Sequence, residues 1–107
     1  MPRHDLARLQ LDARHLHLLR ALLAEYVPGA QVWAYGSRVT GQAHEGSDLD
    51  IVLRNPANLA AETPGRADLL EALHDSDLPM LVDLHDWAHL PETFHRNIER
   101  DYVEIPH

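Results

Sequence analysis

The stretch YGSRVTGQAHEGSDLDIVL, residues 35–53, places a glycine–serine pair ten residues ahead of an Asp-x-Asp. The segment AQVWAY just before it is rich in β-forming residues and predicts a strand over residues 31–35. DLDIVLR, residues 48–54, predicts a second strand, and Arg38–Gly41 between the two predict a helical turn. Two sets of side chains then alternate along the second strand, Leu49, Ile51 and Leu53 on one side and Asp48, Asp50 and Val52 on the other. Two carboxylates therefore share one side of a strand that follows a tight polar turn.

The rest of the chain combines helical and strand patterns. Residues 12–26 carry leucines at three- and four-residue steps, and they predict a helix that starts at Asp12 or earlier, at Asp5. Four further elements are predicted: a helix capped by Thr63, opened by Pro64 and ending near residue 74, a strand over residues 79–84, a helix from about Pro91, and a short edge strand in YVEI. This order predicts a mixed α/β (α+β) fold, a small mixed β-sheet covered by helices.

Length and composition indicate a single domain, residues 1–107, with 45% hydrophobic residues. The chain shows no secretory signal, no apolar stretch of membrane-spanning length and no cysteine, so we expect a cytoplasmic protein. The formal net charge of −8 argues against nucleic acid as a partner. All nine basic residues are arginine, so any phosphate contact must come from arginine, backbone N–H groups or a metal.

The aspartates are candidates for a metal site. Asp48 and Asp50 would stand roughly 7 Å apart along one strand face, an arrangement that a divalent cation stabilises. Asp83 lies inside the apolar run of residues 80–84 and is the candidate for a third carboxylate, which would complete a two-metal Mg²⁺ site. Asp86 is the weaker choice and more simply caps a turn. The competing interpretation is a solvated strand face, with Asp83 as a charge that protects a sheet edge.

The glycine–serine turn is a candidate phosphate site. Gly36 lets the backbone approach a ligand closely, Ser37 offers a hydroxyl and an N–H, and Arg38 can add a cation. A nucleoside triphosphate with Mg²⁺ fits a phosphate cradle beside a pair of carboxylates. Taken without the aspartates, the same residues would be a plain strand–turn–strand connection.

Gly36-Ser37, the ten-residue spacing, Asp48-x-Asp50 and a later strand aspartate resemble the nucleotidyltransferase superfamily of the DNA polymerase β type. The likeness is greatest to the minimal nucleotidyltransferases and extends over most of residues 28–105. It implies transfer of a nucleoside monophosphate, for instance AMP from ATP, to an acceptor hydroxyl. It further implies that Asp48, Asp50 and Asp83 act as catalytic residues and ligands of two Mg²⁺ ions, and that the triphosphate is held by Gly36, Ser37, Arg38 and Ser47.

The resemblance also bears on partners. Minimal members act with a separate helical-bundle protein of the HEPN or substrate-binding type, and some of these pairs are toxin–antitoxin modules in which the partner is adenylylated. Many toxin-modifying members carry an arginine where this chain has Thr40, so the sequence favours the branch paired with substrate-binding proteins. An alternative is an antitoxin-like binding module that neutralises its partner without turnover. An antibiotic-modifying transferase fits less well, because nothing in this chain builds an acceptor pocket.

A few other residues have alternative interpretations. Trp33 and Trp87 are predicted to pack in the core or at its edge, while an exposed Trp87 or Phe94 would anchor a partner. His85 and His89 are four residues apart but are predicted to lie at a strand end and in a loop, so they are interpreted as residues that bind no metal.

Overall fold

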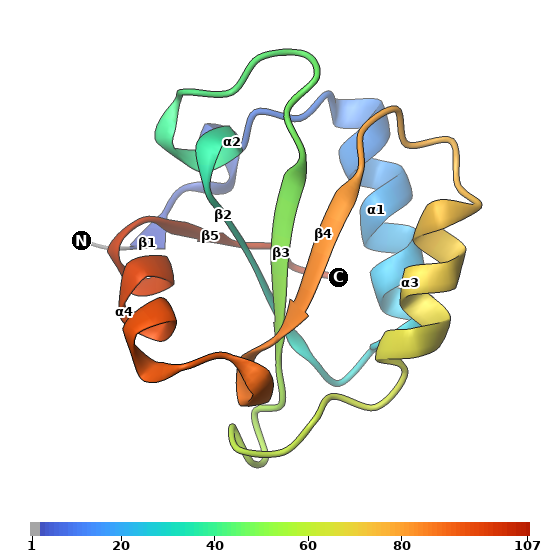
Figure 1. Ribbon diagram of the computed structural model, residues 1–107. Coiled ribbons are helices and arrows are strands. Elements are labelled where there is room, and N and C mark those ends of the chain that lie inside the picture. The colour runs from blue at the N-terminus through green and yellow to red at the C-terminus, as the bar shows by residue number, and fades with distance from the viewer. Residues whose placement is uncertain (1–2) are drawn as a thin grey trace.

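A mixed sheet of five strands, in the order β1-β5-β2-β3-β4, forms the centre of the computed structural model, which describes residues 3–107 (Figure 1). β3 is antiparallel to β2 and parallel to β4, while β5 is antiparallel to β2 and parallel to β1. The strands are β1 (Arg3–His4), β2 (Gln31–Tyr35), β3 (Leu49–Arg54), β4 (Val82–Asp86) and β5 (Tyr102–Glu104). The predicted fold class, a small mixed sheet with helices on it, is confirmed.

Helices cover the two faces of this sheet unequally. Figure 1 shows α1 and α3 side by side on one side of the sheet and α4 on the other. The helices are α1 (Ala13–Tyr26), α2 (Ser37–Thr40), α3 (Arg66–His74) and α4 (Glu92–Arg100), with the 3₁₀ helices η1 (Leu6–Arg8) and η2 (Trp87–His89). None of the helices described between residues 3 and 107 is long and apolar enough to cross a membrane.

The larger core lies between the sheet and the helices α1 and α3. The predicted alternation of β3 holds, because one set of its side chains is completely buried there, Leu49, Ile51 and Leu53. The helical leucines that meet them are equally buried, Leu19 and Leu23 from α1 and Leu69 from α3. Burial of this apolar surface is the main force that fixes the two helices on the sheet.

A smaller, mostly aromatic core lies under α4 on the opposite face. Trp33 stacks on Tyr102 with 3.9 Å between ring centroids, and the Arg54 guanidinium lies over the rings of both Trp33 and Trp87. Trp33 and Trp87 are each 6% exposed, so the predicted packing role of both is confirmed. The alternative in which an exposed Trp87 anchors a partner is wrong, since its ring is stacked against His95.

Two predicted elements have different bounds. The third strand, expected over residues 79–84, runs instead from Val82 to Asp86, because hydrogen bonding to β3 rather than the apolar run decides its start. The third helix starts at Arg66 with Gly65 as N-cap, not at Pro64 with Thr63 as cap. Gly65 has φ +90° and lies against the Tyr26 carbonyl, a conformation and a close approach that favour glycine.

The two ends of the chain also differ from expectation. YVEI was expected at a sheet edge, yet β5 lies between β2 and β1, and Arg3–His4 forms the edge. The first helix uses the later of its two predicted starts, and the earlier start at Asp5 belongs to a separate 3₁₀ helix. Asp5 caps η1 through a bond from the Ala7 amide, whereas α1 begins after Asp12, whose side chain makes no capping bond.

Candidate active site

The register of β3 and β4 brings the predicted carboxylates together. Asp50 and Asp83 are direct cross-strand partners in this parallel pair, so their side chains leave the same face of the sheet. Asp48 stands two residues before Asp50 on that face, just ahead of the strand. Asp48 is exposed, the Asp83 side chain is 53% exposed, and Asp50 is half-buried. We call this group, Asp48, Asp50 and Asp83, the carboxylate row.

The carboxylate row is electrostatically strained. Burial, followed by the negative charges of Asp83 and Asp48, raises the pKa of Asp50 to about 6, and a hydrogen bond with Asp83 adds to this effect. Burial, followed by the negative charges of Asp50 and Asp83, raises the pKa of the Tyr35 phenol, which lies opposite Asp50 in the register. Tyr35 thus stays protonated beside the row. A divalent cation between the carboxylates would relieve the repulsion.

The donor set of the row suits Mg²⁺, which prefers carboxylate oxygens and keeps several waters. As the side chains of residues 3–107 stand, no three histidine, aspartate or glutamate groups converge on one point. Asp48 and Asp83 are exposed enough to turn toward Asp50. The residues therefore fit the ion after a rotation of exposed side chains.

His85 is a member of the site that sequence reasoning missed. Its Nε2 lies 3.2 Å from Asp83 Oδ1, and its side chain is 38% exposed. Phe94 of α4 borders the same spot, with ring centroids 6.3 Å from His85 and 6.0 Å from Tyr35. The two-residue period of the strand, which puts Asp83 and His85 on one side, is the signal that would have found it.

The glycine–serine turn lies directly against the row. Gly36 has φ +79° and ψ −156°, and a methyl group added there would overlap Asp50 Oδ2. The predicted helical turn forms as α2, which ends at Gly41 in the left-handed conformation. Ser37, the first residue of α2, is partly exposed beside the carboxylates. The turn and the aspartates are thus neighbours in space, as the triphosphate interpretation requires.

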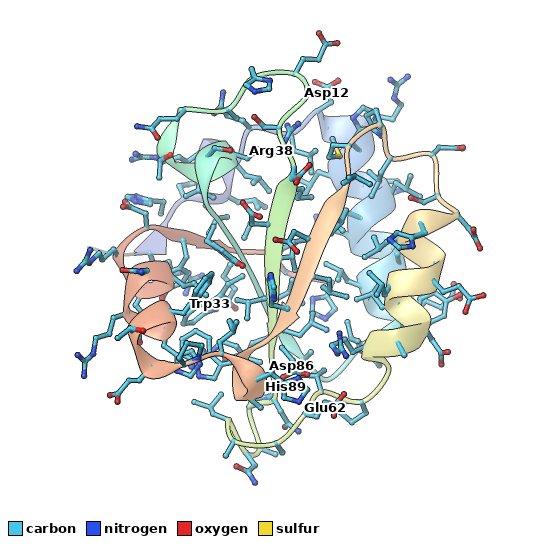
Figure 2. All side chains as sticks on the ribbon, viewed as in Figure 1. Asp12, Trp33, Arg38, Glu62, Asp86 and His89 are labelled. Atoms are coloured by element: carbon cyan, nitrogen blue, oxygen red, sulfur yellow. The ribbon has the colours of Figure 1, made fainter. Side chains whose placement is uncertain are left out.

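Arg38 has a structural role that the sequence did not predict. It is 7% exposed, and its guanidinium donates to the carbonyl oxygens of Gln10 at 2.7 Å and Ser47 at 2.8 Å and 3.1 Å, with a longer bond to Glu45 (Figure 2). The side chain is therefore engaged by the loop that leads into β3, and its predicted contact with a triphosphate stays a prediction. A buried guanidinium must be hydrogen-bonded, because burying an unpaired charge is energetically costly.

Ser47 is part of the same loop. Its hydroxyl accepts a bond of 3.0 Å from the His44 amide, and its carbonyl binds Arg38. Ser47 was predicted to contact the triphosphate. Its observed bonds suggest a second role, in which Ser47 and Arg38 together fix the backbone just before Asp48.

Asp86 lies apart from the row, at the other end of β4 near Glu62 and His89 (Figure 2). It is 2% exposed and accepts bonds from the amides of Thr63 at 2.7 Å and Ala88 at 3.3 Å. The interpretation of Asp86 as a turn cap is confirmed. Its buried carboxylate ties the loop before α3 to the end of β4.

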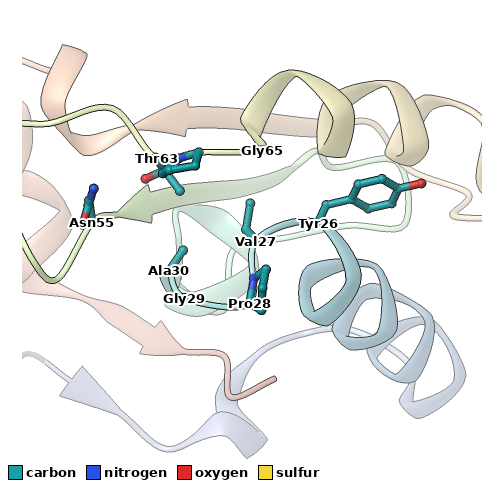
Figure 3. A pocket seen from close by; sticks show the side chains of 9 residues that line it. Tyr26, Val27, Pro28, Gly29, Ala30, Asn55, Thr63 and Gly65 are labelled. Atoms are coloured by element: carbon teal, nitrogen blue, oxygen red, sulfur yellow. The ribbon is translucent and has the colours of Figure 1, made fainter.

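A pocket of about 350 Å³ lies at the far end of the molecule from the row (Figure 3). It is formed by the turn after α1, the end of β3 and the start of α3, with Val27, Asn55 and Thr63 among its lining residues. The carboxylate row stands instead on an open face, as the exposure of Asp48 and Asp83 shows.

A carboxylate pair on adjacent strands, next to a glycine turn on a mixed sheet, is the arrangement that the resemblance predicts. A family model described as "Nucleotidyltransferase domain" matches residues 16–105, and the chain belongs to this family. It is a nucleotidyltransferase, as the sequence predicted.

One relative and one solved structure make the comparison more specific. The "Probable protein adenylyltransferase MntA" of Haemophilus influenzae is 42% identical over 101 residues, covering 92% of this chain and 85% of the relative. A structure described as "Crystal structure of the toxin-antitoxin with AMP-PNP" has a TM-score of 0.63 at 21% identity, covering 89% of this chain and 73% of its own. The latter shows a shared fold. From Thr40, the sequence favoured the branch paired with substrate-binding proteins. The name of this relative, a probable protein adenylyltransferase, does not support that branch.

Proposed function

We propose that this chain transfers a nucleoside monophosphate, with ATP as the donor, to a hydroxyl group of a partner protein in a Mg²⁺-dependent reaction. The observation that carries the proposal is the Asp50–Asp83 cross-strand pair beside the Gly36 turn. The name of the 42% identical relative, a probable protein adenylyltransferase, supports adenylylation in particular. The solved structure with AMP-PNP is consistent with an adenine nucleotide.

The roles follow from the positions of the side chains. Asp48 and Asp50 would hold both Mg²⁺ ions, and Asp83 would hold the catalytic one. When bound, the ions would supply positive charge that neutralises the phosphates and lowers the pKa of the acceptor hydroxyl. Gly36 and Ser37 would receive the triphosphate. The acceptor oxygen bonds to the α-phosphorus, the bond to the bridging oxygen breaks, pyrophosphate leaves, and Asp83 takes the acceptor proton. Positioning and charge neutralisation supply most of the rate in such transfers.

The proposed acceptor is carried by a separate helical-bundle protein of the HEPN or substrate-binding type. The open carboxylate face supports this, because a transferase with no wall around its site needs a second molecule to exclude water. The toxin–antitoxin description of the solved structure favours a toxin as that partner. The cytoplasm, which supplies the nucleoside triphosphate, is the proposed place of the reaction.

The test is incubation of the purified chain with the protein encoded next to it, Mg²⁺ and ATP labelled at the α-phosphate. Label on the neighbour, lost in Asp50→Asn and in EDTA, is the expected result. Label that persists in Asp50→Asn would remove the carboxylate row from the reaction. A stable complex that never becomes labelled would favour the alternative, an antitoxin-like module that only docks.

A further inference from the structure

The order of groups across the sheet sets the side from which the acceptor arrives, if the proposed function holds. The strands β2, β3 and β4 lie next to one another in the sheet (Figure 1). The Gly36 turn follows β2, Asp48 comes just before β3, Asp50 stands on β3, and Asp83 stands on β4. In a nucleotidyl transfer the attacking and leaving oxygens lie roughly in line. Pyrophosphate held at the Gly36 turn therefore leaves on the β2 side, and the acceptor must enter over the start of β4.

An exposed leucine lies at that entry. Leu81 is 69% exposed, and its carbonyl accepts a 2.9 Å bond from the Leu49 amide, so it extends the β3–β4 ladder by one residue. The alternation of β4, in which Val82 is buried and Asp83 is exposed, puts Leu81 on the side of Asp83. Extending the register by one pair puts Leu81 beside Asp48. At this exposure, most of the Leu81 side chain lies in solvent.

Several acidic residues accompany Leu81 in the sequence and across the strand pair. Asp48 stands opposite it in the extended register, Asp83 follows two residues later, and the exposed Asp75 and Asp77 precede it in the segment that leads into β4. Bound Mg²⁺ would neutralise Asp48 and Asp83 but would leave the charges of Asp75 and Asp77. Charge complementarity then calls for arginine or lysine in whatever binds here.

We propose that Leu81 is the apolar contact for the acceptor segment of the partner protein, and that this segment pairs an apolar side chain with flanking arginine or lysine residues. Leu81 is a specificity-determining residue in this reading. Burial of most of a leucine on binding corresponds to about a tenfold change in acceptor affinity.

Leu81→Ser tests the proposal against Leu59→Ser. Leu59 is the other large hydrophobic side chain exposed in residues 3–107, at 39%, and it lies in the loop after β3, at the far end from the carboxylate row. With the neighbouring gene product as acceptor and ATP as donor, we expect Leu81→Ser to raise KM for the acceptor about tenfold. We expect kcat and KM for ATP to stay within about twofold, and Leu59→Ser to match the parent chain. Leu81→Met should restore the acceptor KM.

The outcomes separate this inference from the proposed function. Labelling of the acceptor with equal KM in the parent, Leu81→Ser and Leu59→Ser would overturn the role of Leu81 while the transferase assignment stands. No labelling by the parent chain would overturn both. The charge assignment is tested by Asp75→Asn/Asp77→Asn, expected to raise the acceptor KM about threefold or more at low salt. An unchanged KM would overturn the requirement for basic flanking residues.

Discussion

Gly36 shows how a single residue couples the phosphate turn to the carboxylates. Its φ of +79° with ψ of −156° lies in a region open essentially only to glycine, and its Cα faces Asp50 Oδ2. Gly36→Ala should lower the free energy of unfolding by about 1–3 kcal/mol from backbone strain, and should push the Asp50 carboxylate out of place. Urea denaturation together with the labelling assay measures both effects.

Gly29→Ala is the matched control for this prediction. Nothing lies within 4 Å of a methyl group at Gly29, and its φ is not positive. We expect a change in unfolding free energy within about 0.5 kcal/mol and full transfer activity. If Gly36→Ala behaved like Gly29→Ala, the contact between the turn and Asp50 would not exist in solution.

Asp50 makes the stability of the metal-free protein depend on pH. Its folded pKa of about 6 lies above the ordinary 3.8, so between about pH 4 and 6 the folded state holds a proton that the unfolded chain has released. Stability contributed by this group therefore falls as pH rises through that window. Asp50→Asn should remove this loss and make the variant more stable than the parent at pH 7, by about 1 kcal/mol, while transfer is abolished.

The measurement is the difference in urea midpoint between parent and Asp50→Asn, followed from pH 4 to 8 in EDTA. The difference cancels the titration of carboxylates outside the row. A difference that is flat with pH would contradict the burial and charge repulsion assigned to Asp50.

At the scale of elements, the loop before β3 depends on Arg38. The guanidinium joins α2 to carbonyl oxygens of Gln10, Glu45 and Ser47. Lysine cannot reproduce this planar, branched set of bonds, so Arg38→Lys should cost about 2 kcal/mol of stability. Cleavage after Glu45 by a glutamate-specific protease should become faster, because the loop is held less firmly. Half-maximal activity should need a higher Mg²⁺ concentration, because the position of Asp48 depends on this loop.

Arg96→Lys serves as the control for Arg38→Lys. The Arg96 side chain is 67% exposed and pairs only with Glu92 on α4, so its replacement should change stability by less than about 0.5 kcal/mol. Equal protease sensitivity in the two variants would show that the loop does not rely on Arg38.

Elements with strong local patterns were predictable from the sequence. β2 has the predicted bounds, and β3 and α4 agree within one residue, because strand alternation and four-residue apolar steps are local signals. The predicted starts of β4 and α3 were wrong, because contacts between residues far apart in the sequence decide where these two elements begin. Pairing with β3 starts β4 at Val82, and the close approach of Gly65 to Tyr26 overrides the Thr63–Pro64 capping signal.

At the scale of the whole molecule, the composition of the candidate site was predictable but its assembly was not. Asp48 and Asp50 are neighbours by sequence, whereas the place of Asp83 opposite Asp50 depends on the register of two strands more than 30 residues apart. The structural role of Arg38 was missed for the same reason. Its acceptor at Gln10 is 28 residues away, and no local pattern reveals that the side chain is buried.

The acidic chain as a whole should gain stability from the ions it is proposed to bind. Mg²⁺ at about a hundred times its Kd adds about 2.7 kcal/mol, which raises Tm by roughly 10 °C or more in a domain of this size. Thermal unfolding with Mg²⁺, and with EDTA added afterwards, measures the gain and its reversal. NaCl at equal ionic strength controls for screening of the net charge of −8. An equal gain in Asp50→Asn would place the ion elsewhere.

The unequal division of aromatic side chains has an optical consequence. Both tryptophans, Trp33 and Trp87, belong to the smaller core under α4, and the leucine-rich core under α1 and α3 has none. Tryptophan fluorescence therefore reports on the smaller core alone, whereas circular dichroism reports on the helices next to both cores. Coincident melting curves from the two signals would show that the two halves unfold as a single cooperative unit.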